Sequence, residues 1–328
     1  MRRRVVVVCA LAAMVCARAS SAQDERWISL MQLADVHDHA GNYKQAEHLY
    51  REAVRMAEGF QDHRYPEALD GLANVLNETG RYPDAERLYI KALSLMEALK
   101  GKENADYAVM SVNLGMHYSE TGQNRKAEKL IREAIACFGR VAPADDLRVA
   151  QARNALSVIL IGLKQYAEAE TALLQALEVF RKKPEPGNGR LAVSLANLGA
   201  VRRYQGRLQE SAELFSQAIA VVDEELSDTH PLLLRELNNL ALVEMTLGHH
   251  DAAEAAFRRA VVVAERRNLT THPTYGKLLL NYAEFERKIG NKHEAKSLAA
   301  QAKMVLADSA RANGVGMTVD ASAFRSRR

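Results

Sequence analysis

The sequence predicts an all-α solenoid, a stack of seven helix–turn–helix repeats with almost no strand. Three columns of residues recur at one spacing, which is 39 residues for the first step and 42 for each later step. The first column is alanine throughout: Ala53, Ala92, Ala134, Ala176, Ala218, Ala260 and Ala302. The second is glycine with one lysine: Gly41, Gly80, Gly122, Lys164, Gly206, Gly248 and Gly290. The third is leucine with one tyrosine: Leu33, Leu72, Leu114, Leu156, Leu198, Leu240 and Tyr282. Seven copies of a short unit indicate a solenoid, because a single copy cannot bury its own apolar surface.

The sixth copy shows how the residues specify each element. Pro231 suits a first helical turn, where it has no amide to lose. Leu233 and Leu237 begin an apolar stripe at three- and four-residue steps, which predicts a helix. Gly248 ends that helix by permitting a left-handed backbone, and Asp251 is expected to cap the next helix. Each repeat is therefore predicted to be an antiparallel pair of helices of about 17 residues.

The ends of the chain differ from the repeats. Residues 1–22 combine a basic head, an apolar run (Val5–Ala17) and small residues at the cleavage positions Ser20 and Ala22, which is typical of a secretory signal peptide. The apolar run is too short to span a bilayer, although an uncleaved anchor is the alternative. We therefore expect a protein exported to the periplasm or secreted, with no stable membrane insertion, that begins near Gln23.

The repeats themselves are expected at about residues 27–60, 66–101, 108–143, 150–185, 192–227, 234–269 and 276–312. A helix stop then precedes the tail, residues 313–328. The tail either folds back over the last repeat or is a disordered, partner-seeking strand. We expect the first, because Val319 and Phe324 are costly to leave in water.

The charge balance argues against a nucleic-acid or membrane-surface protein. The chain has 44 lysines and arginines against 41 carboxylates, and loss of the signal peptide with its four arginines leaves 40 against 41. A near-neutral chain has no global attraction for polyanions. The charges are unevenly distributed, however: residues 23–180 hold 18 basic and 24 acidic side chains, and residues 181–328 hold 22 and 17. This asymmetry supports an alternative function, a structural subunit that assembles head to tail into a homo-oligomer.

Metal, redox and catalytic functions are not supported. Cys137 falls in a column that is otherwise apolar, which predicts a small buried hydrophobe. The cluster His37-Asp38-His39 does not converge, because helical residues two apart diverge by about 200°. The cluster at His249–Asp251 lies in a turn, where it is expected to cap and be solvated. No phosphate loop, zinc-protease motif or nucleophile elbow is present. We therefore expect no cofactor, no metal and no enzyme activity.

The chain resembles the tetratricopeptide repeat family, specifically the long 42-residue form of kinesin light chains, from Trp27 to about Ala312. The matching segments are Gly41–Glu47, Gly80–Glu86, Leu163–Glu170 and Leu237–Ala241, with His-Pro pairs at 230 and 272. The resemblance implies two helices per repeat, a right-handed superhelix and a concave groove lined by the first helix of each repeat. It also implies protein or peptide binding without naming the partner.

In this family the residue before the leucine column faces the groove and is often an asparagine that holds a peptide backbone. Here that column reads Gln32, Gly71, Asn113, Ala155, Asn197, Asn239 and Asn281. Neighbouring groove positions of repeats five to seven are basic, aromatic or amide: Arg203, Tyr204, Arg235, Asn238 and Lys277. We therefore expect an extended, acidic protein or peptide ligand on repeats five to seven, with Asn113 as a further contact. The alternative is that these amides bond neighbouring helices.

Overall fold

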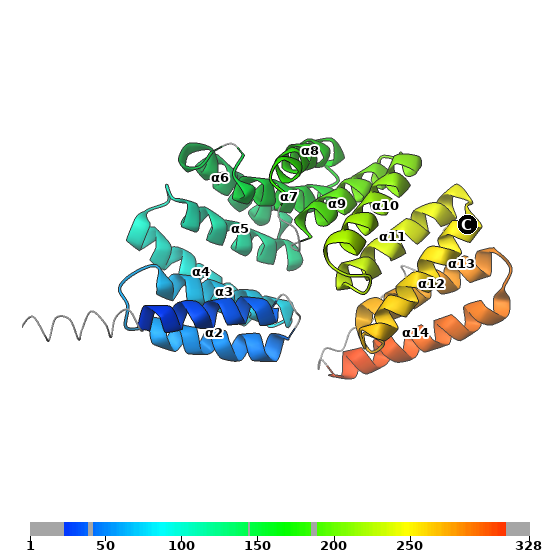
Figure 1. Ribbon diagram of the computed structural model, residues 1–328, viewed down its shortest axis with the longest axis horizontal. Coiled ribbons are helices and arrows are strands. Elements are labelled where there is room, and N and C mark those ends of the chain that lie inside the picture. Colours follow the sequence, from blue (N-terminus) through cyan, green and yellow to red (C-terminus); the bar gives the residue numbers. More distant parts are fainter. Residues whose placement is uncertain (1–22, 39–41, 144, 185–188, 313–328) are drawn as a thin grey trace, which may run out of the picture. The chain divides into compact units, whose positions relative to one another are not determined.

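The computed structural model describes residues 23–38, 42–143, 145–184 and 189–312, and these contain helices and no strand (Figure 1). The regular column spacing of the sequence is matched by fourteen consecutive helices in the described residues, which confirms the predicted all-α repeat fold. The helices are residues 23–38, α2 (Tyr43–Ala57), α3 (Arg64–Glu78), α4 (Tyr82–Lys100), α5 (Ala105–Glu120), α6 (Asn124–Val141), α7 (Leu147–Gly162), α8 (Tyr166–Lys182), α9 (Arg190–Tyr204), α10 (Leu208–Glu225), α11 (Pro231–Leu247), α12 (His250–Arg266), α13 (Pro273–Lys288) and α14 (Lys292–Ala312).

The chain divides into two compact units, Met1–Leu163 and Lys164–Arg328. Within each unit the first helix of a repeat contacts the first helix of the next repeat, as α3, α5 and α7 do in the first unit and α9, α11 and α13 do in the second. Within each unit, the described residues of the second helices (α2, α4 and α6 in the first unit, and α8, α10, α12 and α14 in the second) make no such contacts with one another. In a curved stack of two helix layers, the layer whose successive helices lie closer together is on the inner, concave side. We therefore call the first helix of each repeat the inner helix and the second the outer helix.

The turns between paired helices follow the glycine column. Gly80, Gly122, Gly206, Gly248 and Gly290 all have positive φ values, which confirms their predicted role as helix stops. Lys164, the one departure, adopts the same left-handed conformation with φ of 62°.

The helix starts agree with the sequence analysis in one case and correct it in another. Pro231 is the first residue of α11, as predicted, and His230 caps this helix through its side chain. Asp251 does not cap α12: the helix begins at His250, so Asp251 lies inside its first turn. A carboxylate there still interacts favourably with the helix dipole.

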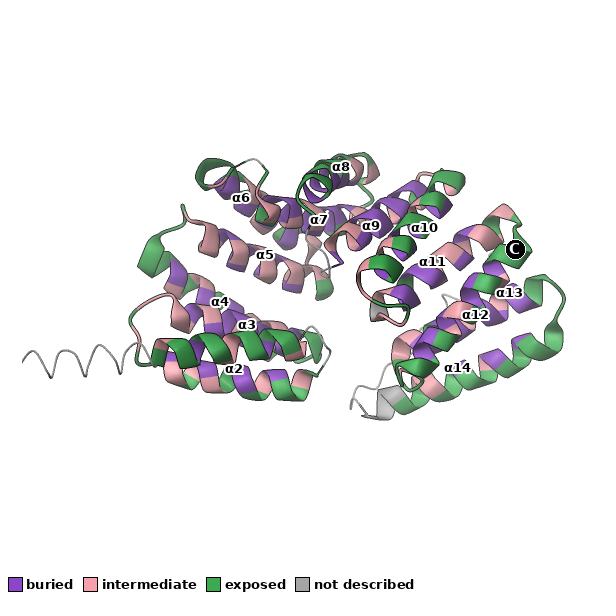
Figure 2. Cartoon of the chain, viewed as in Figure 1, coloured by how far each residue is buried: buried purple, intermediate pink, exposed green. Residues whose placement is uncertain are grey.

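The core lies between helices, where neighbouring faces meet (Figure 2). Every residue of the alanine column is buried, because any larger side chain would separate helices that pack at this point. Cys137 is buried too, and burial raises the pKa of its thiol, as expected of a small core residue rather than a reactive one.

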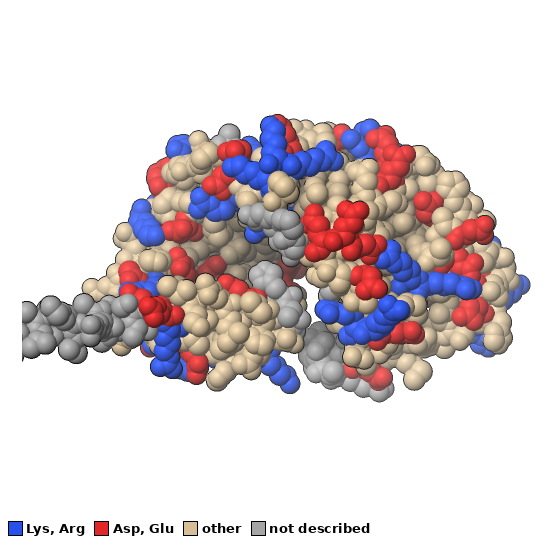
Figure 3. Space-filling view, in the orientation of Figure 1, with Lys and Arg blue, Asp and Glu red and all other residues tan. Residues whose placement is uncertain are grey.

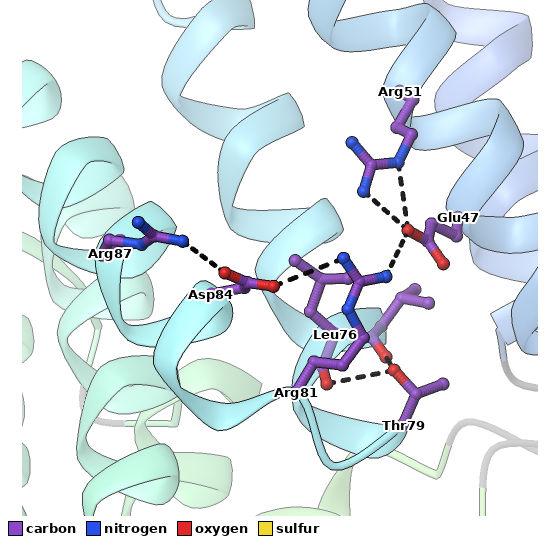
Figure 4. A network of polar contacts seen from close by, with 8 residues as sticks. Glu47, Arg51, Leu76, Thr79, Arg81, Asp84 and Arg87 are labelled. Carbon is purple, nitrogen blue, oxygen red and sulfur yellow. Dashed lines mark hydrogen bonds and ion pairs between the residues drawn. The ribbon is translucent and has the colours of Figure 1, made fainter.

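Acidic and basic side chains are interspersed over the face seen in Figure 3. Several charged side chains join consecutive repeats. Arg81, in the turn before α4, donates to Glu47 of the preceding outer helix at 2.7 Å and lies 3.4 Å from Asp84 (Figure 4). Arg51 donates to the same Glu47 oxygen at 2.7 Å, and Arg87 pairs with Asp84.

The same arrangement recurs in the second unit. Arg207 occupies the position of Arg81, lies 3.7 Å from Glu170 and pairs with Glu210 at 2.5 Å. These ion pairs therefore belong to the contact between consecutive repeats. They recur because equivalent positions of different repeats have the same geometry.

No helix in the described part of the chain is long and apolar enough to cross a membrane. The predicted signal peptide (residues 1–22) and tail (residues 313–328) lie outside the described residues.

Candidate peptide-binding surface

Eight of the nine predicted binding residues lie on three consecutive inner helices of the second unit, α9, α11 and α13. The ninth, Asn113, lies on α5 in the first unit. Because α11 contacts both α9 and α13, the eight residues share one inner layer. We call this layer of the second unit, with Asn197, Arg203, Tyr204, Arg235, Asn238, Asn239, Lys277 and Asn281, the inner surface of repeats five to seven.

An amide row crosses the middle of this surface. Asn197, Asn239 and Asn281 occupy equivalent positions on the three helices, and all three are partly exposed. Asn281 donates from Nδ2 to Oδ1 of Asn238 on the neighbouring inner helix at 2.9 Å. The amides therefore do link adjacent helices, which was the alternative role. They also retain exposed surface from which to bond a ligand.

The same interhelix bond occurs in the first unit. Asn113 of α5 donates from Nδ2 to Oδ2 of Asp70 on α3 at 2.7 Å. Asn113 is equivalent to Asn281, and Asp70 is equivalent to Asn238, so the two bonds connect the same positions of different repeats.

Cations flank the amide row on both sides. Arg235 and Lys277 lie one helical turn before Asn239 and Asn281, so they project from the same faces. Tyr204 lies two turns after Asn197 on α9, with Arg203 beside it.

Arg235 is partly neutralised by a carboxylate beneath it. Its Nη2 lies 2.6 Å from Oε1 of Glu236, which is 1% exposed. Burial raises the pKa of Glu236, and the bonds from Arg235 and Asn239 act in the opposite direction. Glu236 therefore orients Arg235 and Asn239 and weakens the positive charge that Arg235 offers to a ligand.

Arg203 and Lys277 have no carboxylate partner among the described residues. The Arg203 guanidinium lies 5.1 Å from the centre of the Tyr204 ring, and its Nε is buried without a hydrogen-bond acceptor. Lys277 is exposed on α13. By contrast, Arg202 is buried and bonds Glu170 at 2.5 Å, so that neighbour of Arg203 belongs to the contact between helices.

Tyr204 forms one half of an aromatic pair. Its ring stacks on Tyr166 of α8 with 5.2 Å between centroids and an angle of 7° between planes. Tyr204 is 50% exposed, so part of its aromatic surface remains accessible at the C-terminal end of α9, beside Arg203. Such a surface suits an apolar or aromatic ligand side chain.

Two residues that contact this surface, Tyr166 and Glu236, were missed in the sequence analysis. Tyr166 resembles the tyrosines Tyr43 and Tyr82, which recur at the start of outer helices, so it carried no separate signal. Glu236 did carry a signal in the sequence, because its carboxylate interrupts a column of small or apolar residues. The equivalent positions in repeats two to five are Ala68, Met110, Ala152 and Ser194.

The surface offers hydrogen-bonding amides, unpaired cations and an aromatic face, which suit recognition of an extended chain. In the described ranges, no group of three or more histidine, cysteine, aspartate or glutamate side chains is placed to hold a metal ion.

Three models of the tetratricopeptide repeat match the chain. One matches residues 64–139 and 148–224, another residues 17–98, and the third residues 237–274. Together they cover well over half of the sequence. No curated protein sequence matches it.

Solved structures show the same fold. BtubC (BKLC) from P. vanneervenii is 23% identical, with a TM-score of 0.56 over 67% of this chain and 88% of that one. Kinesin light chain TPR-like repeats from Podosopora anserina are 18% identical, with a TM-score of 0.52 over 62% and 95%. A Rap protein complexed with Competence and Sporulation Factor is 14% identical, with a TM-score of 0.57 over 89% and 99%.

The helix pairs, the column spacing and these matches agree. The chain belongs to the tetratricopeptide repeat family, and its fold is similar to that of kinesin-light-chain-like repeats.

Proposed function

We propose that this protein is an exported, non-enzymatic scaffold that binds an extended acidic peptide or protein segment on the inner surface of repeats five to seven. The observation that carries the proposal is the amide row flanked by Arg203 and Lys277, two cations without carboxylate partners in the described residues. Amides bond a peptide backbone whatever its side chains, and unpaired cations select for acidic ones.

The family supports this class of function. Tetratricopeptide repeats are scaffolds for protein–protein interaction, and a Rap protein of similar fold holds Competence and Sporulation Factor. That ligand belongs to the Rap protein and does not identify the partner of this chain.

The test uses the two unpaired cations. A labelled peptide of alternating glutamate and serine should bind the wild-type protein, and the R203A/K277A variant should bind it roughly tenfold more weakly, because each of the two charges contributes a modest part of the affinity. The matched control is K296A/K303A, which removes two exposed lysines from the outer helix α14. Equal loss in both variants would reduce the interaction to nonspecific charge attraction, and unchanged binding in R203A/K277A would overturn the proposal.

Export has its own test. Mass spectrometry of the protein recovered from cells should show a chain that begins near Gln23. A full-length chain retained in the cytoplasm would contradict export without affecting the proposed binding surface. Partners captured from the cell envelope and identified by mass spectrometry can then replace the synthetic peptide in the binding assay.

A further inference from the structure

The inner helices of repeats one to three are strongly acidic. Within residues 23–38, α3 and α5 there are nine carboxylates and two arginines, whereas α9, α11 and α13 together have seven basic residues and four carboxylates. Arg64, one of the two arginines, is already paired with Asp62 and Asp24. We use the name acidic surface for Asp35, Asp38, Glu67, Asp70, Glu78 and Glu120 on these three helices.

All of these carboxylates except Glu67 lie near one or both of two tyrosines, Tyr50 and Tyr89. Burial is the main cause that raises the pKa of the Tyr50 hydroxyl, and the charges of Asp35, Asp38 and Asp70 raise it further. Burial is likewise the main cause that raises the pKa of Tyr89. The charges of Asp70, Glu120, Glu78 and Asp38 raise it further. Residues from three inner helices therefore contribute to one negative region.

Asp70 is the centre of this region and is incompletely satisfied. Its side chain is 8% exposed, and Oδ2 accepts the bond from Asn113. Oδ1 is buried and accepts no hydrogen bond from the described residues. A buried carboxylate oxygen without a donor is costly, so positive charge placed near Asp70 is stabilising.

The charge of Asp70 is not needed for the contact between helices. In the second unit the same interhelix bond is made by a neutral pair, Asn281 and Asn238, at 2.9 Å. Asparagine at position 70 would preserve the bond from Asn113. The negative charge is therefore additional to what the fold requires.

Three of the carboxylates, Glu67, Asp70 and Glu78, form no ion pair among the residues that the structure describes. The nearby charges of His63 and Lys100 offset only part of the effect of burial on Glu67, whose pKa is raised. Burial raises the pKa of Glu78, and the nearby charges of Glu120 and Asp38 raise it further, which indicates mutual repulsion. Because the carboxylates are spread over three helices and form no metal-binding group, they suit several separate cations better than one ion.

We propose that the acidic surface binds an extended, arginine- or lysine-rich polypeptide segment, whose basic side chains pair with the exposed carboxylates Glu78 and Glu120 beside the buried carboxylate of Asp70. Such a segment supplies positive charges at intervals along a backbone and offsets the negative charge of all three carboxylates. This inference does not depend on the proposed function of repeats five to seven, because different residues and ligands of the opposite charge are involved.

The test is a titration with a labelled peptide of alternating arginine and serine. The wild-type protein should bind it, and D70N/E78Q should bind it roughly tenfold more weakly, since charge-assisted bonds are lost. D70N keeps the acceptor for Asn113, so the variant is expected to fold, which circular dichroism checks. The control E58Q/E133Q removes two exposed carboxylates that lie outside the acidic surface and should bind like the wild type.

The other outcomes overturn the proposal. Unchanged binding by D70N/E78Q would exclude the acidic surface, and equal loss in E58Q/E133Q would indicate nonspecific charge attraction. Displacement of the peptide by an equal concentration of Mg²⁺ would indicate a small-cation site instead. The R203A/K277A variant should keep full affinity for the basic peptide, so failure of one proposed surface is distinguishable from failure of the other.

Discussion

Lys164 holds a backbone conformation that its side chain disfavours. It has φ of 62°, whereas the described equivalents in the other repeats are glycines with positive φ. We predict that Lys164→Gly raises stability by about 0.5–1 kcal/mol, because relief of left-handed strain exceeds the added entropy of the unfolded chain. Urea denaturation measures the effect. The reverse change, Gly206→Lys, should lower stability, and a destabilised K164G would contradict this interpretation.

Gly71 is required for a close contact. A Cβ at this position would lie 2.4 Å from Cε1 of Tyr50, a buried ring. We predict that Gly71→Ala costs about 1–3 kcal/mol, because the well-packed ring must shift. Gly59→Ala is the control, since a Cβ there meets nothing within 4 Å. Thermal unfolding should separate the two variants, and equal melting temperatures would show that the Tyr50 ring moves freely.

Asp70 should make stability depend on pH. Burial raises its pKa to about 7, well above the value of about 3.9 in an unfolded chain. The folded state therefore holds the proton more tightly, so the stabilisation is complete at low pH and is lost as the pH rises through about 7. We predict that Asp70→Asn is more stable than the wild type at pH 8, with a smaller difference at pH 5. Urea denaturation at both values measures this difference, and a gap that widens at pH 5 would contradict the assigned sign.

At the same scale, the sequence predicted which amides form the central row but not all of their bonds. The 42-residue spacing places Asn197, Asn239 and Asn281 in one column whatever their partners. The bond from Asn281 to Asn238 depends on the distance between neighbouring inner helices, which the spacing alone does not specify. The Glu236 contact beneath Arg235 likewise required the three-dimensional packing.

At the scale of elements, the first inner helix differs from its six successors. Leu33 and Val36 are 46% and 63% exposed, whereas the equivalent residues of the second repeat, Leu72 and Val75, are 5% and 0% exposed. In later repeats the preceding outer helix covers these positions. The helix of residues 23–38 therefore presents an apolar face that no described residue covers.

The last outer helix, α14, also differs from the outer helices of the six earlier repeats. Lys303 continues a column that is aliphatic in the six earlier repeats: Val54, Leu93, Ile135, Leu177, Ile219 and Val261. A lysine there is typical of a capping repeat with a polar outer face. Head-to-tail association, the alternative function, requires apolar faces at both ends, and the described part of α14 does not favour it.

This contrast gives a prediction for the first helix. Leu33→Ser with Val36→Ser should reduce concentration-dependent light scattering and leave the melting temperature almost unchanged, because both side chains are already exposed. Leu72→Ala should instead cost about 2–5 kcal/mol, since the equivalent leucine is buried. Strong destabilisation of the L33S/V36S variant would mean that this face is covered in solution.

The elements themselves were largely predictable. Apolar periodicity, the glycine column and Pro231 specify where helices lie and end. The start of α12 was not predictable from the sequence. This helix begins at His250, shortly after the turn at Gly248, so Asp251 lies within its first turn.

At the scale of the whole molecule, uneven charge along the sequence becomes a difference between two inner layers. Folding places the carboxylates of repeats one to three on the acidic surface and the cations of repeats five to seven beside the amide row. The sequence analysis predicted the basic positions of repeats five to seven and the acidic excess of the first half, because the repeat spacing assigns charged residues to inner helices. It did not predict which charges are paired, and those pairs distinguish Arg203 and Lys277 from Arg202 and Arg235.

Photo-crosslinking tests the central claim most directly. An acidic peptide with a photoreactive residue at its centre is bound, irradiated and mapped by mass spectrometry. We predict crosslinks to α9, α11 and α13, with few to the outer helices α10, α12 and α14, and loss of these crosslinks in R203A/K277A. Crosslinks concentrated on the outer helices or on α3 and α5 would contradict the assignment of acidic-segment binding to the inner surface of repeats five to seven.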